Sequence, residues 1–420
     1  MGEMTGAKDY PPPVETRTLM SRTQSTTIRR AMQENPEPVR PPGRLDIAIH
    51  ARLDEAETDW RRLEAIGVLT PYQRYDWIAG LLAAGADADA RIAIAIIARD
   101  GETLAILPLA LRRRFGLVQA EMLGARQSNT DWIIARPDFA PAPAELRTLF
   151  EAIARAAGGI DLIRLQNQPA AWQGMANPML GLDHAPAPSN LYMTGIGGVS
   201  EPYIEHRLTT KRRNNIKRGK RRLEEQFGPV RLVRIADPEA LERVHAIFLE
   251  QRGRRFSAMG VGNIFAQPPF PGFFRSLATD SFAQQRPALV LHALMVGDEV
   301  AATCWGTMAG NHYSQYINST TEGPAGRYSL MGILLAELMD ELIRGGIESF
   351  DMGLGDFDYK AEWTEPLPVF DSLVPLSVRG AAIAALQRRQ GALKRLIKQT
   401  PPLWHAAKWL RRQLSRLRPD

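Results

Sequence analysis

Four side chains that can move protons or fix anions fall between residues 351 and 360. The stretch FDMGLGDFDYKAEW contains Asp351, Asp356, Tyr359 and Lys360, with glycines between them that favour a tight turn. A carboxylate can accept a proton, a phenol can return one, and a lysine ammonium can hold an anion. The structural alternatives are that the two aspartates cap turns and that Tyr359 packs on Trp363. All four residues are candidate catalytic residues.

The residues before this turn predict a strand, a loop and a helix, in that order. NHYSQYINST (311–320) is typical of a strand, and LMGILLAELMDELIRGG (330–346) of a long amphipathic helix that ends at paired glycines. IESFDMG (347–353) then predicts a buried strand that returns to the same edge. A helix start offers free N–H groups and the positive end of a dipole to a pyrophosphate. This order predicts a phosphate-binding site beside the candidate catalytic turn.

The rest of the chain alternates between helix and strand patterns. Two apolar hairpins are predicted, one turning at Asp100-Gly101 and the other at Gly297-Asp298. Each hairpin follows predicted helices and precedes a further strand and helix, which suggests two copies of one fold. Helices are predicted over 60–67, 70–85, 142–159, 211–228 and 238–256, and further strands over 114–124, 160–168 and 230–236. The predicted class is α+β, with mixed sheets flanked by helices.

Length and composition divide the 420 residues into four expected parts. Residues 1–44 are rich in proline and charge and predict a disordered leader. We expect an N-terminal domain over 45–195 and a C-terminal domain over 196–380. Residues 381–420 predict a basic amphipathic helical tail, because residues 386–420 contain ten basic residues and one acidic residue. The net charge of that stretch is +9 and the net charge of the whole chain is +6, so the remaining residues have a net charge of −3.

Charge and residue usage also limit the expected partners. The single cysteine and the scattered histidines predict no metal site. The basic run from Arg207 to Arg222 lacks interleaved aromatic residues, so nucleic acid is a disfavoured partner. The start of the chain has no apolar signal segment, and the expected location is the cytoplasm. The basic tail is suited equally to packing on its own domain and to peripheral contact with an anionic membrane or a polysaccharide synthase.

The segment from Gln315 to Trp363 resembles the GNAT-type acyltransferases of the CelD-like kind, associated with cellulose biosynthesis and related to the FemAB transferases. The basic helix over 211–224, the hairpin VGDEVAA and the first-half motifs TPYQRYDW, LPLAL and LGARQSNTDW share in the resemblance. Its most specific part is Asp-x-Gly followed by Tyr-Lys and an aromatic residue. This chain has Ser329-Leu330-Met331-Gly332 where the family usually has a Ser-Pro-Gly turn.

The resemblance implies tandem GNAT-like domains and an acyl-CoA donor, acetyl-CoA or a longer thioester. It places the thioester near residues 311–319 and the pyrophosphate near residues 326–332. The implied donor-binding residues are Tyr316, Asn318, Gly326, Arg327, Tyr328, Ser329 and Gly332. In the implied reaction Asp351 or Asp356 accepts the proton of an amine, Tyr359 returns one to sulfur, and Lys360 holds a carboxylate or the CoA phosphates.

The expected activity is transfer of an acyl group to an amine or hydroxyl, with a sugar or exopolysaccharide precursor as a candidate acceptor. One alternative is a FemAB-like aminoacyl transferase that uses aminoacyl-tRNA. The absence of an obvious coiled-coil arm in the sequence counts against it. A second alternative is a catalytically silent partner of a polysaccharide-synthesis complex.

Overall fold

The computed structural model describes residues 45–114, 116–400 and 402–403. They belong to one compact unit, Leu45–Asp420. The predicted leader over 1–44 and the tail beyond residue 403 lie outside the described residues.

The first sheet is built mainly from the first half of the chain. Adjacent strands in this sheet are antiparallel except β4 and β6, which are parallel. A short strand, β5 (Ile134–Ala135), also pairs with β3. The strand order is β1 (Asp46–His50), β2 (Arg91–Arg99), β3 (Glu102–Arg114), β4 (Leu117–Met122), β6 (Leu162–Pro169), β17 (Val369–Pro375) and β9 (His184–Pro186).

The second sheet follows the same plan, again with one parallel pair, β14 and β15. Its order is β11 (Val230–Ile235), β12 (Val290–Val296), β13 (Glu299–Ala309), β14 (His312–Thr320), β15 (Ser349–Leu354), β10 (Leu191–Gly195) and β16 (Glu365–Leu367). In both sheets the first four strands follow one another in chain order, and the parallel pair is formed by the fourth and fifth strands. Both predicted hairpins, β2–β3 and β12–β13, are present. The predicted α+β class with mixed sheets is confirmed.

Each sheet takes one strand from the other half of the chain. In the second sheet β10, from residues 191–195, pairs with β15. In the first sheet β17, from residues 369–375, pairs with β6. The chain thus crosses between the sheets twice, and the expected boundaries at 195 and 380 remain predictions.

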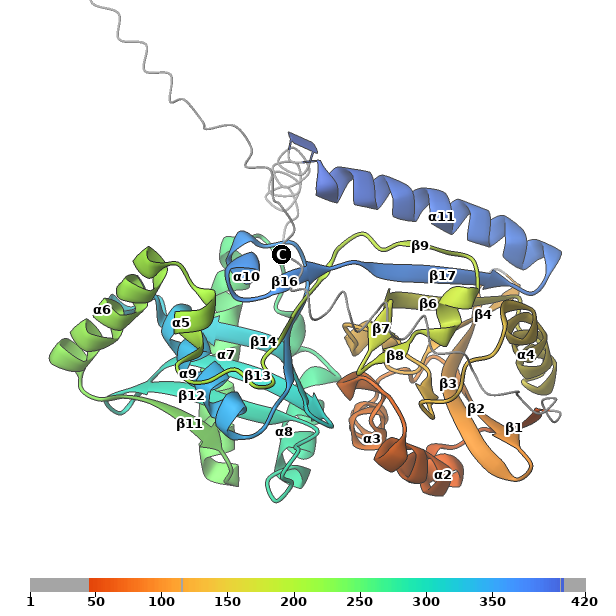
Figure 1. Cartoon of the computed structure of the whole chain (residues 1–420), viewed down its shortest axis with the longest axis horizontal. Helices are drawn as coiled ribbons and strands as arrows, with labels where there is room; N and C mark the ends of the chain where they lie inside the picture. The colour runs from red at the N-terminus through yellow and green to blue at the C-terminus, as the bar shows by residue number, and fades with distance from the viewer. Residues whose placement is uncertain (1–44, 115, 401, 404–420) are drawn as a thin grey trace, which may run out of the picture. The chain divides into compact units, whose positions relative to one another are not determined.

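Helices cover both faces of the second sheet, and α11 runs along β17 of the first (Figure 1). Residues of α6 and α9 share one apolar cluster with the second sheet, and residues of α7 and α8 share another. The helices are α2 (Leu53–Ile66), α3 (Tyr75–Ala83), α4 (Pro143–Ala156), α5 (Tyr203–Arg207), α6 (Thr210–Phe227), α7 (Pro238–Ala258), α8 (Phe270–Asp280), α9 (Leu330–Arg344), α10 (Asp358–Trp363) and α11 (Val378–Gln399). Shorter pieces are the 3₁₀ turns η1 (Pro71–Gln73), η2 (Ala125–Gln127), η3 (Pro178–Gly181), η4 (Ile264–Ala266) and η5 (Pro324–Arg327), and the strands β7 (Ala171–Trp172) and β8 (Met175–Ala176).

The prediction of one continuous helix over 70–85 is wrong. The chain makes the turn η1, becomes extended at Arg74, and begins α3 at Tyr75. The Arg74 side chain donates to Glu64 and to the carbonyl oxygens of Arg286 and Met308. These contacts with distant segments accompany the break in the helix, and local sequence does not reveal them.

One apolar core is shared by the two halves of the chain. Trp60 and Trp77 of the first half lie in the same buried cluster as Phe273, Phe274 and Trp305 of the second. The rings of Trp77 and Phe273 meet edge to face, with centroids 4.8 Å apart. This shared core fixes α3 against α8 and holds first-half residues close to β14.

Candidate active site

The site is organised by the divergence of the parallel strands β14 and β15. Only three residue pairs join them, and the last is Ser314 with Asp351. Past that point β15 continues beside β10, whereas β14 continues beside β13. In β14 a bulge leaves Tyr316 without a partner, between Gln315 and Ile317, which pair with consecutive residues of β13. Beyond Ser314, which we call the outer half of β14, one edge of the strand is therefore not paired with β15. An extended ligand that adds to a strand requires such an unpaired edge.

A cavity of about 270 Å³ lies beside the outer half of β14, and we call it the donor groove. The start of α9 forms one wall, so that helical N–H groups lie at the groove. The other walls come from α6, α7 and α10. The lining residues are Arg212, Arg255, Asn318, Thr320, Gly326, Ser329, Leu330, Met331, Gly332, Leu335, Tyr359 and Trp363.

Arginines from two other helices bring positive charge to the groove. Arg212 of α6 donates to the Ser329 hydroxyl at 3.2 Å and pairs with Glu362 at 2.9 Å. Arg255 of α7 also lines the groove. The neighbouring Arg252 donates to the carbonyl oxygen of the lining residue Asn318, and burial, reinforced by the charge of Arg255, lowers the pKa of Arg252 to about 10. Together with the start of α9, these cations suit a ligand with several negative charges.

Four of the predicted donor residues line this groove. They are Asn318, Gly326, Ser329 and Gly332. Ser329 has a left-handed backbone with φ of 49° and is the residue before α9. The predicted start of that helix at Leu330 is confirmed, although the chain lacks the usual Ser-Pro-Gly turn.

The other three predicted donor residues lie elsewhere. The Tyr316 ring packs in the shared core, with its centroid 5.3 Å from that of Trp77. The exposed Arg327 guanidinium lies over the Tyr328 ring, and both side chains donate to Gln226 of α6. Contact of these three residues with a donor remains a prediction. Arg212 and Arg255, which line the groove, were not identified from the sequence. The only sequence signal for Arg212 was the basic run over 207–222, whose simplest interpretation is a solvated helix face.

Asp351 lies at the point of divergence and is almost completely buried. Its carboxylate accepts the Ser314 hydroxyl at 2.9 Å and the Gly353 N–H at 2.7 Å, and it lies 2.7 Å from His312 Nε2. The bond to Gly353 is the turn-capping contact that was the structural alternative for this residue. Asp351 therefore ties the end of the paired stretch to the turn that follows it.

The Asp351 network continues into the first half of the chain. The Ser314 hydroxyl lies 2.6 Å from the Tyr72 hydroxyl, which accepts the Asn129 amide at 2.6 Å. Burial, and then the charge of Asp351, raise the pKa of Tyr72 well above its usual value. Tyr72 therefore remains protonated at neutral pH and can donate in this network. Tyr72 and Ser314 are 242 positions apart, and Tyr72 and Asn129 are 57 apart, so sequence spacing could not reveal these contacts.

Lys360 points inward from the turn. Its ammonium donates to the carbonyl oxygens of Gly353 at 3.2 Å and Leu354 at 2.8 Å, at the end of β15. Burial lowers its pKa to about 8, although the charges of Asp351 and Asp356 oppose that shift. In this position Lys360 fixes the backbone of the turn.

Asp356 and Tyr359 belong to the same turn but have different surroundings. Asp356 is exposed and accepts the amide of Asn190 at 3.0 Å and the amide of Gln399 at 3.1 Å. Tyr359 is half-buried in the donor groove, and burial raises its pKa despite the nearby arginines. Tyr359 is therefore a protonated phenol at neutral pH and faces the groove.

Neither a metal site nor a membrane span emerges from the part of the chain that the structure describes. Within residues 45–114, 116–400 and 402–403, no three His, Cys, Asp or Glu side chains are grouped as metal binding would require. No helix in those ranges is long and apolar enough to cross a membrane.

Residues 210–361 match the family described as the acetyltransferase (GNAT) domain. This part of the chain is similar to GNAT acetyltransferases. The matched range contains the β14–β15 divergence, the candidate catalytic residues and every lining residue of the donor groove except Trp363. The predicted enzyme class, a GNAT-type acyltransferase, is confirmed. The repeated strand order in the first sheet makes the fold a tandem GNAT-like one.

Solved structures show the same fold at low sequence identity. A crystal structure of FemX has a TM-score of 0.54 and 12% identity, over 81% of this chain and 99% of that one. A conserved protein of unknown function from Bacteroides thetaiotaomicron VPI-5482 has a TM-score of 0.50 and 10% identity, over 78% of this chain and 99% of that one. No curated protein matches the sequence. FemAB-like architecture is thereby supported, while the narrower CelD-like resemblance remains an expectation.

Proposed function

We propose that the GNAT domain transfers an acyl group from acyl-CoA to an amine, with the donor bound in the donor groove. The observation that carries the proposal is the coincidence of two features in one cavity. The part of β14 that has separated from β15 lines this cavity, and the start of α9 meets Arg212 and Arg255 there. The first feature suits an amide-containing arm, and the second suits a diphosphate.

The donor would lie along the groove. Backbone groups at the outer edge of β14 would pair with the amides of the pantetheine arm, as an added strand would. Helical N–H groups and the two arginines would bind the phosphates. Acetyl-CoA is the simplest such donor, and a longer acyl chain remains an alternative.

The reaction requires a balanced transfer of two protons. The amine nitrogen attacks the thioester carbon, a C–N bond forms, the C–S bond breaks, and the leaving thiolate takes a proton to become the CoA thiol. Asp356 would accept the proton from the amine, because it is exposed to solvent and to an incoming amine whereas Asp351 is buried. Tyr359 would supply the proton to sulfur from inside the groove.

Thiol release from acetyl-CoA, with glucosamine and glucosamine 6-phosphate as amine probes, tests this assignment. We expect Asp356→Asn and Tyr359→Phe to reduce turnover by about a hundredfold, the scale of one acid or base group, with little change in the acetyl-CoA dissociation constant. Wild-type turnover in both variants would remove the two residues from the mechanism. Absence of amine-dependent thiol release in the wild-type protein would contradict the proposed activity.

The acceptor and the location belong to the same proposal. A saccharide precursor fits a transferase with a second, strongly charged pocket near the reacting turn. On α11, Leu386, Leu393 and Leu396 are each more than half exposed and lie among basic residues, which suits peripheral contact with an anionic membrane. Sedimentation with vesicles tests that contact, and equal partition onto neutral and anionic vesicles would argue against it.

A further inference from the structure

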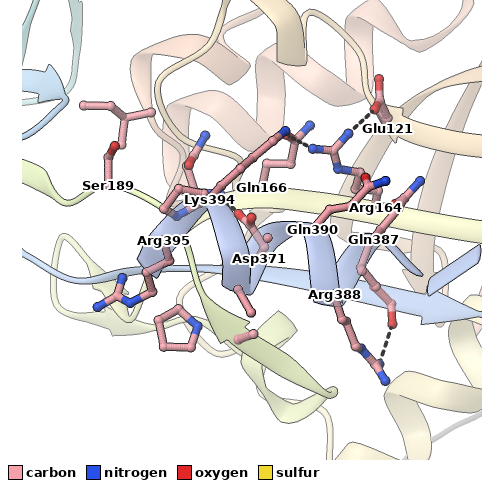
Figure 2. A pocket seen from close by; sticks show the side chains of 18 of the residues that line it. Glu121, Arg164, Gln166, Ser189, Asp371, Gln387, Arg388, Gln390, Lys394 and Arg395 are labelled. Atoms are coloured by element: carbon pink, nitrogen blue, oxygen red, sulfur yellow. Dashed lines mark hydrogen bonds and ion pairs between the residues drawn. The ribbon is translucent and has the colours of Figure 1, made fainter. Parts of the chain in front are cut away.

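A cavity of about 800 Å³ lies under α11 on the first sheet, and we call it the basic pocket. It forms where the parallel strands β4 and β6 part, because only three residue pairs join them and the last is Glu121 with Arg164. The first sheet thus repeats the divergence that forms the donor groove in the second. In Figure 2, α11 crosses over this opening with Gln390 and Lys394 on the same pocket as Arg164 and Gln166 of β6.

The lining of the basic pocket has a large excess of positive charge. Eight lysines and arginines line it, against Glu121 and Asp371 as the acidic members. Part of this charge is neutralised by carboxylates, since Arg112 and Arg164 both pair with Glu121, and Arg112 and Arg126 pair with Asp89. On α11, Arg388 pairs with Asp183, the charge of Lys394 acts on Asp371, and Arg395 donates to a neutral acceptor, the Ala187 carbonyl. Such a pocket favours a ligand with two or more negative charges.

Two buried amide atoms in this lining have no hydrogen-bond partner among the described residues. They are Nε2 of Gln119 on β4 and Oε1 of Gln387 on α11. A buried polar atom without a partner costs free energy, so these two atoms provide one donor and one acceptor that a ligand could satisfy. A donor beside several cations suits phosphate oxygens, and an acceptor suits a hydroxyl of a sugar.

The basic pocket reaches the turn that carries the candidate catalytic residues. Leu354 and Gly355, at the end of β15, line it, and Tyr359 of the same turn lines the donor groove. Gln399 at the end of α11 donates to Asp356. The short turn between residues 354 and 359 therefore borders both cavities, and a ligand in one would lie next to the wall of the other.

We propose that the basic pocket is the acceptor site and that it binds the phosphate or diphosphate of a phosphorylated saccharide. This assignment rests on the proposed acyl transfer, because the donor groove supplies the acyl group. The anionic end of the acceptor binds Lys394, Arg395 and Gln119, and its sugar extends past Gly355 toward Asp356. The same diphosphate chemistry occurs in nucleotide sugars and in lipid-linked sugars.

Calorimetric titration of the full chain with inorganic pyrophosphate tests the site. We expect Lys394→Ala and Arg395→Ala each to weaken binding at least about tenfold, the scale of one charge-assisted hydrogen bond, and Lys394→Arg to retain most of it. Arg389→Ala is the matched control, because Arg389 is an exposed arginine of the same helix that does not line the pocket. Unchanged binding in both alanine variants would overturn the proposal.

A second comparison separates this proposal from the donor assignment. Pyrophosphate binding that is lost in Arg255→Ala but kept in Lys394→Ala would place the anion in the donor groove and would also overturn the acceptor site. If acetyl-CoA binding depends on Arg255 while no variant of the basic pocket affects pyrophosphate, the donor proposal stands and the acceptor proposal fails. Titrations with uridine diphosphate and farnesyl diphosphate then show which source of diphosphate the pocket prefers.

Discussion

At the scale of single residues, the candidate catalytic turn separates into groups that hold the structure and groups that face a ligand. Asp351 and Lys360 are buried and bind the backbone at residues 353–354, so they position the end of β15. Asp356 is exposed, and Tyr359 faces the donor groove. All four residues were predicted to lie in one turn. The sequence could not show which of them are buried, because burial depends on distant segments such as the one around Tyr72.

Lys360 should make stability depend on pH. Its pKa is about 8 in the folded protein and near 10.5 in the unfolded chain, so the unfolded chain binds more protons in that window. The free energy of unfolding should therefore rise from pH 8 to pH 10.5, by about 3 kcal/mol relative to Lys360→Met. Urea unfolding of both proteins across this window measures the difference. A difference that stays flat or falls with pH would show that the lysine is not held in this environment.

At the scale of elements, the donor groove depends on close packing of α6 against α9. A Cβ atom on Gly332 would lie 2.9 Å from the Ser329 hydroxyl and 3.2 Å from the Ile216 side chain. The chain pattern predicted α9 correctly, including its start at Leu330. It could not show that Gly332 is a packing position, because the partner helix comes from more than a hundred residues earlier.

We expect Gly332→Val to lower the free energy of unfolding by about 1–3 kcal/mol, as overpacking does, and to weaken acetyl-CoA binding by displacing Ser329 from Arg212. Gly391→Val is the control, because a Cβ atom on Gly391 of α11 meets no atom within 4 Å. Urea unfolding and acetyl-CoA titration of both variants provide the comparison. Equal stability of the two variants would mean that α6 and α9 are not packed in this way.

At the scale of the whole molecule, strand exchange and a shared core join the two halves. Sequence periodicity predicted the α+β class and the two hairpins because both depend on local patterns. It could not predict that β10 and β17 cross to the opposite sheets, or that Trp77 packs on Phe273, because these contacts are made by segments far apart in the chain. For the same reason Arg212 and Arg255 were not recognised as members of the groove.

The shared core predicts that residues 45–400 unfold in one cooperative transition. Trp77→Ala should lower the free energy of unfolding by about 3–5 kcal/mol, because it empties a fully buried position between the halves. Circular dichroism and tryptophan fluorescence should report the same midpoint in urea for the wild-type protein. Two separate transitions, with only one affected by Trp77→Ala, would show that the halves are energetically independent.

The position of the acyl donor can be tested by measuring the dissociation constant of acetyl-CoA for the wild-type protein and for variants of two neighbouring arginines. Arg255 lines the donor groove, whereas Arg254 is exposed on the same helix and pairs with Glu250. Acetyl-CoA should bind the wild-type protein, Arg255→Ala should weaken this binding at least about tenfold, and Arg254→Ala should leave it unchanged. No binding to the wild-type protein, or equal binding to both variants, would contradict the assignment of the donor groove.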